Sequence, residues 1–242
     1  MPTLSIIIRS FLFQILYLFP TAVFCIVSLF CHILPKSALV FVARTWLRAV
    51  FFLLKYVQGL SYKIEGLENL PKGPYIVASK HQSAFETCVY PLLFDHPIII
   101  LKKELRYIPF WGWLLWKYDA IMIDRSKPKE AMKTILTAAE KEKAGACRPL
   151  LIFPEGTRTR PGAEVKYQNG IAVMYDALKI PVAPIAVNTG IFWGKRGFFR
   201  KPGVATIKIL PPILPGLSKK DFMIHLHNAI ETESFKLLEN LK

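Results

Sequence analysis

The segment YIVASKHQSAFET, residues 75–87, passes from an apolar run through a short polar turn into a helix-forming run. Residues 75–78 predict a buried strand, and residues 84–94 predict a helix that begins after Ser83, a good N-cap residue. A strand followed directly by a helix is the repeating unit of α/β folds, which place their reactive groups at such turns. The segment therefore predicts both a fold class and the place of a site.

The same alternation of strands and helices continues along the chain. The further apolar runs that predict strands are residues 61–64, 98–101, 120–123, 150–153, 182–187 and 204–209. The further helical patterns are residues 129–144, 170–178 and 219–241. We therefore predict an α/β fold, with a mostly parallel sheet flanked by helices, over residues 61–242.

A pair of membrane-anchoring helices is predicted for residues 1–60. Residues 11–34 contain no Asp, Glu, Lys or Arg and are long enough to cross about 30 Å of hydrocarbon. After Pro35, Arg44, Arg48 and Lys55 fall on one stripe of an otherwise apolar helix, as in helices at the headgroup level. Either the first helix spans the membrane and the second lies at its surface, or both dip into one leaflet. The cations after the first helix predict that the α/β domain lies on the cytoplasmic side of the cell (inner) membrane.

The chain is strongly basic, with 32 Lys plus Arg against 17 Asp plus Glu and a formal net charge of +15. Such a balance attracts polyanions: nucleic acid, anionic membrane lipids or phosphorylated small molecules. The apolar N-terminus favours the last two, and no nucleic-acid recognition motif is present. No CxxC pair or His cluster has metal-ligand spacing, so we predict no metal site, and reduced thiols at Cys25, Cys31, Cys88 and Cys147.

The polar turn contains a candidate general base. His81 lies in the turn, and Glu86 lies in the first turn of the following helix. Glu86 is therefore placed to accept a hydrogen bond from one ring nitrogen of His81, which leaves the other nitrogen to take a proton. The structural alternative is a capping box of Ser83 and Glu86, and the two interpretations are compatible.

A second cluster, FPEGTR at residues 153–158, follows the strand predicted for residues 150–153. Gly156 permits an unusual backbone angle or the close approach of a ligand. Arg158 offers a planar fork that binds phosphate with two hydrogen bonds, and Glu155 offers an acceptor for a hydroxyl or for that arginine. A plain loop after a strand is the alternative.

Three weaker signals accompany these clusters. Asp124-Arg125 closes a strand and offers either a cation at the strand end or a surface salt bridge. Pro184 interrupts the apolar run of residues 182–187, which predicts either a buried edge strand or one wall of an apolar groove. Residues 102–113, KKELRYIPFWGW, mix cations with aromatics, as an interfacial lip or a solvated charge run beside core aromatics does.

Taken in order, these motifs resemble those of the glycerolipid acyltransferases of the 1-acyl-sn-glycerol-3-phosphate acyltransferase (PlsC) type. The motifs are His81 with Glu86, Asp124-Arg125, FPEGTR at residues 153–158, and the strand around Pro184. Each is weak alone, but four in this order and spacing are specific, and the resemblance covers roughly residues 62–210. The first block of the family usually reads H-x-x-x-x-D, whereas this chain has a glutamate, which we interpret as a subtype.

The resemblance implies a reaction and roles for the residues. A fatty acyl chain would pass from acyl-CoA or acyl carrier protein directly to the sn-2 hydroxyl of lysophosphatidic acid, giving phosphatidic acid, with no metal or redox cofactor. His81 would be the base, Glu86 would orient it, and Pro184 would belong to the wall of the acyl-binding region. The residues implied to contact the acceptor are Lys103, Arg125, Glu155, Gly156, Thr157 and Arg158. Acylation of another lysolipid, and a non-catalytic lipid-binding protein at the membrane surface, are the alternatives.

Overall fold

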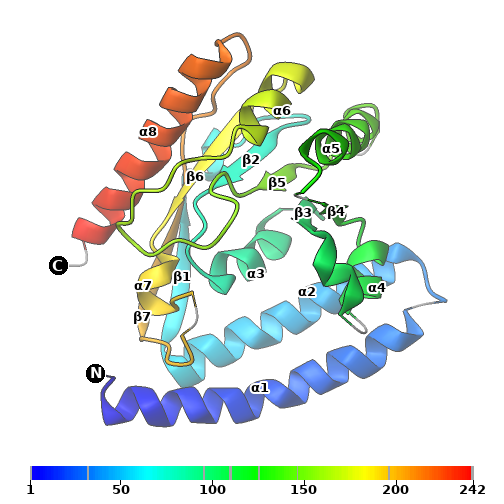
Figure 1. Cartoon of the computed structure of the whole chain (residues 1–242). Coiled ribbons are helices and arrows are strands. Elements are labelled where there is room, and N and C mark those ends of the chain that lie inside the picture. Colours follow the sequence, from blue (N-terminus) through cyan, green and yellow to red (C-terminus); the bar gives the residue numbers. More distant parts are fainter. Residues whose placement is uncertain are drawn as a thin grey trace.

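The computed structural model describes residues 2–31, 33–94, 96–108, 111–124, 126–145, 147–195 and 197–240 (Figure 1). A seven-stranded sheet has the order β1-β7-β6-β2-β5-β3-β4. The strands are β1 (Leu60–Glu65), β2 (Ile76–Ser79), β3 (Ile98–Lys102), β4 (Ile121–Ile123), β5 (Leu150–Ile152), β6 (Val182–Val187) and β7 (Gly203–Ile209). The strands β6, β2, β5, β3 and β4 are parallel, β7 is antiparallel to β6, and β1 is parallel to β7. The prediction of a mostly parallel sheet is confirmed.

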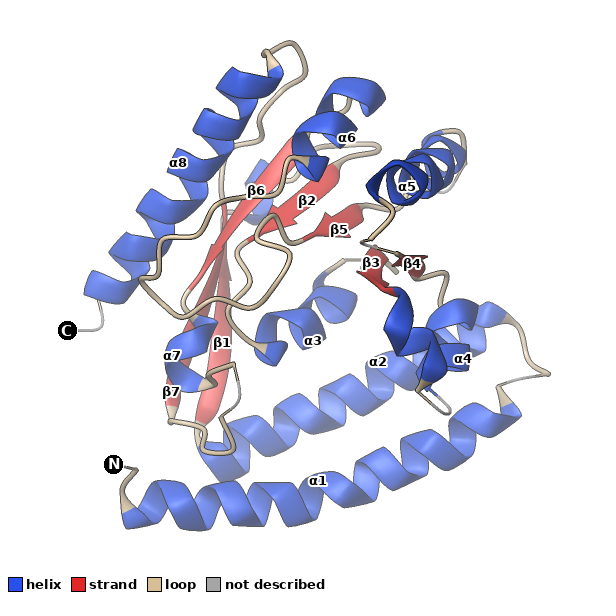
Figure 2. Cartoon of the chain, in the orientation of Figure 1, coloured by secondary structure: helices blue, strands red, loops and turns tan. Residues whose placement is uncertain are grey.

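Helices cover both faces of this sheet (Figure 2). The helices α5 (Pro128–Lys143), α6 (Gly170–Leu178) and α8 (Lys219–Glu239) pack on one face. The helix α3 (Ala84–Leu93) packs on the other face, together with the N-terminal helices. These strands and helices agree with the predicted ones almost residue for residue. The sequence did not predict the helices α4 (Trp111–Lys117) and α7 (Thr189–Phe192), or the 3₁₀ turns at Leu67–Asn69 and Lys103–Tyr107.

The prediction of an edge strand around Pro184 is wrong. The strand β6 lies inside the sheet, between β7 and β2. The carbonyl of Pro184 accepts a hydrogen bond from the backbone N–H of Leu210 at 2.9 Å, just beyond the last residue of β7. Since the N–H and C=O of one strand residue point to the same side, the N–H that proline lacks would also point to the end of β7. A central strand therefore accommodates the proline there without breaking the ladder to β2.

The N-terminal helices form a hairpin along one side of the molecule (Figure 1). They are α1 (Leu4–Phe30) and α2 (Lys36–Leu53), and a π-helical turn, Leu54–Gln58, extends α2. Phe13 of α1 and Val50 of α2 share a buried cluster with Phe85 of α3. The opposite side of α1 exposes large apolar side chains, among them Phe11, Ile15, Phe19, Ile26 and Phe30. Both segments are long and apolar enough to cross a membrane, by length and composition.

Candidate active site

The turn between β2 and α3 holds a histidine and a carboxylate in contact. The Nδ1 atom of His81 lies 2.9 Å from Oε1 of Glu86. Within the described part of the chain, Nε2 of His81 makes no hydrogen bond, and the side chain is 14% exposed. Phe153 stacks on the imidazole with ring centroids 3.9 Å apart and planes tilted by 19°, which fixes the plane of the ring. The geometry suits a histidine that donates from Nδ1 and accepts a proton at Nε2.

The carboxylate of Glu86 is fully buried and held by several donors. Its Oε1 atom accepts hydrogen bonds from the backbone N–H groups of Gln82 at 2.8 Å and Ser83 at 2.7 Å. Its Oε2 atom accepts one from the hydroxyl of Thr189, at the start of α7, at 2.7 Å. The capping box with Ser83 is present, so this glutamate both caps α3 and orients His81. Sequence reasoning missed Thr189, which no local pattern connects to the turn.

The FPEGTR loop holds the backbone of the same histidine. The backbone N–H of His81 donates to Oε1 of Glu155 at 3.1 Å. Its carbonyl accepts from the backbone N–H of Thr159 at 2.8 Å and from the hydroxyl at 3.0 Å. One hydrogen bond from the second cluster, and two from the residue that follows it, thus hold the backbone of His81. They place Glu155 behind the histidine as a positioning residue. A contact between Glu155 and the acceptor stays a prediction.

A buried ionic network extends from Glu155 to α8. The ammonium of Lys80, whose side chain is 1% exposed, lies 2.6 and 2.8 Å from the two oxygens of Glu231 and 3.5 Å from Glu155. Tyr167 donates a further hydrogen bond to Glu231 at 2.7 Å. Burial raises the pKa of Glu155 to about 7, and its Oε2 atom has no hydrogen-bond partner among the described residues. Burial thus outweighs the backbone N–H of His81 and the ammonium of Lys80, both of which lower the pKa of this carboxyl.

The FPEGTR loop carries the cation Arg158, and the loop after α7 carries the cation Lys195. Gly156 has φ of 70°, in the left-handed region that favours glycine, and its N–H bonds back to the carbonyl of Phe153 at 2.9 Å. Arg158 donates to the carbonyl of Lys195 at 3.2 Å, and the ammonium of Lys195 donates to the hydroxyl of Thr157 at 3.3 Å. The loop after α7 thereby places a second cation beside Arg158, and sequence reasoning did not single it out.

The remaining predicted residues lie further along the sheet. Lys103 follows β3 and is ion-paired with Asp124, and this hydrogen bond holds the pKa of Asp124 at about 2. Since β5 separates β2 from β3, Lys103 lies two strand spacings from the turn of His81, roughly 10 Å, along the same edge. Arg125 lies outside the described residues. Pro184 is buried on the face of β6 under α8, as is Ala186, and its role as an acyl wall stays a prediction.

Comparisons with known proteins identify the family of the chain. The family model described as Acyltransferase matches residues 61–188. The 1-acyl-sn-glycerol-3-phosphate acyltransferase of Pseudomonas aeruginosa is 39% identical over 207 residues, which cover 84% of this chain and 80% of that protein. The chain belongs to the acyltransferase family. The non-catalytic lipid-binding protein that the sequence left open is therefore set aside.

A yeast protein and a solved structure are also similar to this acyltransferase. The 1-acyl-sn-glycerol-3-phosphate acyltransferase of Saccharomyces cerevisiae is 33% identical over 195 residues, which cover 78% of this chain and 62% of that protein. The crystal structure of the 1-acyl-sn-glycerophosphate acyltransferase PlsC from Thermotoga maritima superposes with a TM-score of 0.75 at 21% identity. That superposition covers 95% of this chain and 97% of the other, and it establishes the fold.

Among the residues that the structure describes, no side chain next to His81 is arranged as a nucleophile. Burial, followed by the nearby carboxylate of Glu86, raises the pKa of the Cys88 thiol to about 12, so the thiolate is scarce at neutral pH. The hydroxyl of Ser83 is used as the helix cap, where it accepts from the N–H of Phe85 at 3.1 Å. None of the described residues form a group of three or more His, Cys, Asp or Glu side chains able to hold a metal ion.

Proposed function

We propose that this acyltransferase moves a fatty acyl chain from a thioester donor to the sn-2 hydroxyl of lysophosphatidic acid and so makes phosphatidic acid. The proposal rests on the His81–Glu86 pair, at 2.9 Å, which leaves Nε2 able to take a proton at the carboxyl edge of the sheet. The Pseudomonas and yeast relatives, both named as 1-acyl-sn-glycerol-3-phosphate acyltransferases, support the choice of acceptor. The donor is acyl-CoA or acyl carrier protein.

The geometry supports a direct transfer with His81 as general base. Its Nε2 atom takes the proton of the acceptor hydroxyl as the oxygen attacks the thioester carbonyl, and a tetrahedral intermediate forms. The carbon–sulfur bond then breaks, and the thiolate takes the proton back from the imidazolium. The products are the acylated acceptor and the free thiol. Glu86 holds the ring in position and stabilises the imidazolium while the proton is on it.

The cations of the FPEGTR loop and the loop after α7 support recognition of a phosphorylated acceptor. Arg158 lies on the FPEGTR loop, and Lys195 lies on the loop after α7. The two loops are in contact, because Arg158 donates to the carbonyl of Lys195 and Lys195 donates to the hydroxyl of Thr157. A guanidinium binds a phosphate with two hydrogen bonds, and an ammonium adds a point charge. Lys103 lies roughly 10 Å along the same edge, within the length of a glycerol phosphate headgroup and the start of its chain. A neutral lysolipid would offer no phosphate to Arg158 and Lys195.

The N-terminal hairpin supports attachment to one leaflet. Because α2 shares a core cluster with α3, a membrane-crossing α2 would carry the globular domain into the hydrocarbon. The exposed apolar side of α1 is instead suited to lie in the leaflet, with the domain at the headgroups. We therefore assign residues 1–60 to the anchor and residues 61–242 to the catalytic domain, on the cytoplasmic side that the cations favour.

A panel of acceptors tests the proposal. The purified full-length protein would be incubated in nonionic detergent with each donor, acyl-CoA or acyl carrier protein, and one lysolipid at a time. We expect the highest kcat/KM with lysophosphatidic acid, and a rate about 10²–10⁴-fold lower with His81→Ala. Higher activity with lysophosphatidylcholine or a lyso-aminolipid would refute the acceptor and leave the base intact. Acylation of lysophosphatidic acid by His81→Ala at more than roughly a tenth of the wild-type rate would refute the mechanism.

A further inference from the structure

The first turn of α7 contacts the turn between β2 and α3 that carries His81. The hydroxyl of Thr189 donates to Oε2 of Glu86 at 2.7 Å, and the backbone N–H of Gly190 donates to Oε1 of Gln82 at 3.1 Å. Both hydrogen bonds are buried, and they join residues 103 and 108 positions apart in the chain. The short helix α7 therefore supports the two residues that flank and orient the base.

The approach of α7 to this turn is as close as its backbone allows. A Cβ atom on Gly190 would lie 2.9 Å from Cβ of Gln82 and 2.9 Å from Cγ of Pro161, closer than carbon atoms pack. At the other end of α7, a Cβ atom on Gly203 would lie 2.3 Å from the ring of Phe192. Glycines thus permit close contacts at both ends of α7, and these contacts fix its position.

Thr189 supplies a donor that one oxygen of Glu86 otherwise lacks. The Oε1 atom faces Nδ1 of His81 and accepts from the backbone N–H groups of Gln82 and Ser83. Over the described ranges of the chain, the hydroxyl of Thr189 is the one hydrogen-bond donor to Oε2. Because the glutamate side chain is fully buried, water does not reach this oxygen. A buried carboxylate oxygen without a donor is costly, so the hydroxyl stabilises the charged form in this orientation.

The charge and orientation of Glu86 matter when His81 takes the proton of the acceptor. The imidazolium that then forms is stabilised by the carboxylate 2.9 Å from Nδ1. A buried carboxylate that loses a donor either rotates to find another partner or takes up a proton. Either change weakens its interaction with the imidazolium, although nothing that touches the substrate has been removed.

We propose that Thr189 is a positioning residue of the acyl transfer, which holds Glu86 charged and directed at His81. The inference rests on the proposed function, because it concerns the same base. The same short helix leads into the loop of Lys195, whose ammonium donates to the hydroxyl of Thr157 in the FPEGTR loop. It thus connects the support of the base with the cations proposed to bind the acceptor.

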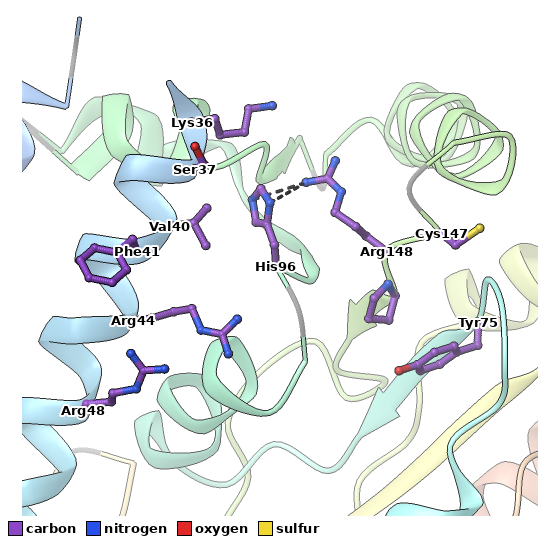
Figure 3. A pocket seen from close by; sticks show the side chains of 11 residues that line it. Lys36, Ser37, Val40, Phe41, Arg44, Arg48, Tyr75, His96, Cys147 and Arg148 are labelled. Atoms are coloured by element: carbon purple, nitrogen blue, oxygen red, sulfur yellow. Dashed lines mark hydrogen bonds between the residues drawn. The ribbon is translucent and has the colours of Figure 1, made fainter. Parts of the chain in front are cut away.

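A polar network at the opposite edge of the sheet offers a control for stability (Figure 3). Arg148 donates to Glu142 at 2.9 Å, to Asp119 at 3.1 Å and to Nδ1 of His96 at 3.2 Å. Arg148 and His96 line a pocket of about 720 Å³, and both precede strands, whereas His81 follows one. The four residues of β2 separate the two edges by about 13 Å. A variant in this network changes stability without touching the turn of His81.

The test measures kcat and KM of the full-length protein in nonionic detergent, with lysophosphatidic acid and a thioester donor. Thr189→Val removes the hydroxyl and keeps the shape of the side chain, and Thr189→Ser keeps the hydroxyl and removes the methyl group. Thr206→Val is the matched control, because Thr206 is a buried threonine of β7 that does not contact Glu86. Arg148→Gln is the stability control, and Tm is measured for every variant.

We expect Thr189→Val to lower kcat about tenfold or more, with little change in the KM for either substrate. Thr189→Ser should work at close to the wild-type kcat. Thr206→Val and Arg148→Gln should keep the wild-type kcat, although Arg148→Gln lowers Tm. A Thr189→Val protein with the wild-type kcat would overturn the proposal. So would a Thr189→Ser protein as slow as Thr189→Val, because the methyl group and not the hydroxyl would then be what matters.

A double variant separates the role of Thr189 from that of the base. Since the hydroxyl acts only through Glu86, Thr189→Val combined with Glu86→Gln should be as slow as Glu86→Gln alone. A further loss of about tenfold in the double variant would mean an independent role and would overturn the proposal. If Glu86→Gln and His81→Ala keep the wild-type rate, the proposed mechanism and this inference both fail. If those two variants are slow and Thr189→Val is not, only the role of Thr189 fails.

Discussion

Lys80→Met should destabilise the protein through the buried ionic network behind the active site. The ammonium lies 2.6 and 2.8 Å from the oxygens of Glu231 and 3.5 Å from Glu155, and the lysine side chain is 1% exposed. Methionine keeps most of the apolar stem, so the loss is mainly that of the charge. Removing one partner of a buried pair costs about 3–5 kcal/mol, and the partial exposure of Glu231 favours the lower end. For a chain of this length about 3 kcal/mol corresponds to roughly 6–12 °C in Tm.

The assay is thermal unfolding of the full-length protein in nonionic detergent, followed by circular dichroism. The control is Lys208→Met, because Lys208 pairs with Glu233 on the same helix α8 but nearer the surface, and its loss should cost no more than about 1 kcal/mol. Lys80→Met combined with Glu231→Gln should recover part of the loss, since the amide removes the stranded charge and still accepts from Tyr167. A Tm for Lys80→Met equal to that of Lys208→Met would refute the reasoning.

Three further predictions concern the carboxylates and the arginine. Glu86→Gln should lower kcat/KM nearly as far as loss of the base does, about 10²–10⁴-fold, with little change in Tm because the amide still caps α3. Glu86→Asp should keep partial activity. A Glu86→Gln variant that works at the wild-type rate would contradict the orienting role. Arg158→Ala should raise the KM for the acceptor by a factor that corresponds to about 1.5–3 kcal/mol, and Arg158→Lys should restore it in part. An equal rise of the KM for the thioester donor would mean that the arginine only supports the loop of Lys195. The pKa of Glu155 is raised from 4.5 to about 7, so between these pH values the folded protein retains a proton that the unfolded chain loses. The free energy of unfolding should therefore fall by about 3 kcal/mol as the pH rises from 4.5 to about 7. Chemical unfolding at several pH values should show this fall in the wild type and not in Glu155→Gln.

The local parts of the site could be predicted from the sequence. His81 and Glu86 are five residues apart across a strand-to-helix turn, so the capping rules that place the glutamate in the first turn of α3 also bring it to the histidine. The FPEGTR loop follows a buried strand, and strand ends of a parallel sheet meet at one edge. Short-range rules therefore sufficed for both clusters.

The partners that come from distant elements could not be predicted. Thr189 is 103 residues from Glu86, and Glu231 is 151 residues from Lys80. Only the order of the strands brings these residues together, and no local pattern encodes that order. The error at Pro184 has a similar cause, since a proline is excluded from a central strand only where a neighbouring strand needs its N–H. That neighbour, β7, ends beside it, and the register of β7 is a property of the whole sheet.

The central claim is that His81 removes the proton from the acceptor hydroxyl, and the rate of acyl transfer by His81→Ala tests it most directly. The measurement is product formation from radiolabelled lysophosphatidic acid and a saturating thioester donor, with Tm and lysolipid binding measured on the same preparation. His225→Ala, which alters an exposed histidine of α8, is the matched control and should keep the wild-type rate. We predict that His81→Ala loses about 10²–10⁴-fold in rate with unchanged Tm and binding. A His81→Ala protein that keeps more than roughly a tenth of the wild-type rate would contradict the account, because the loss of a general base costs far more than that.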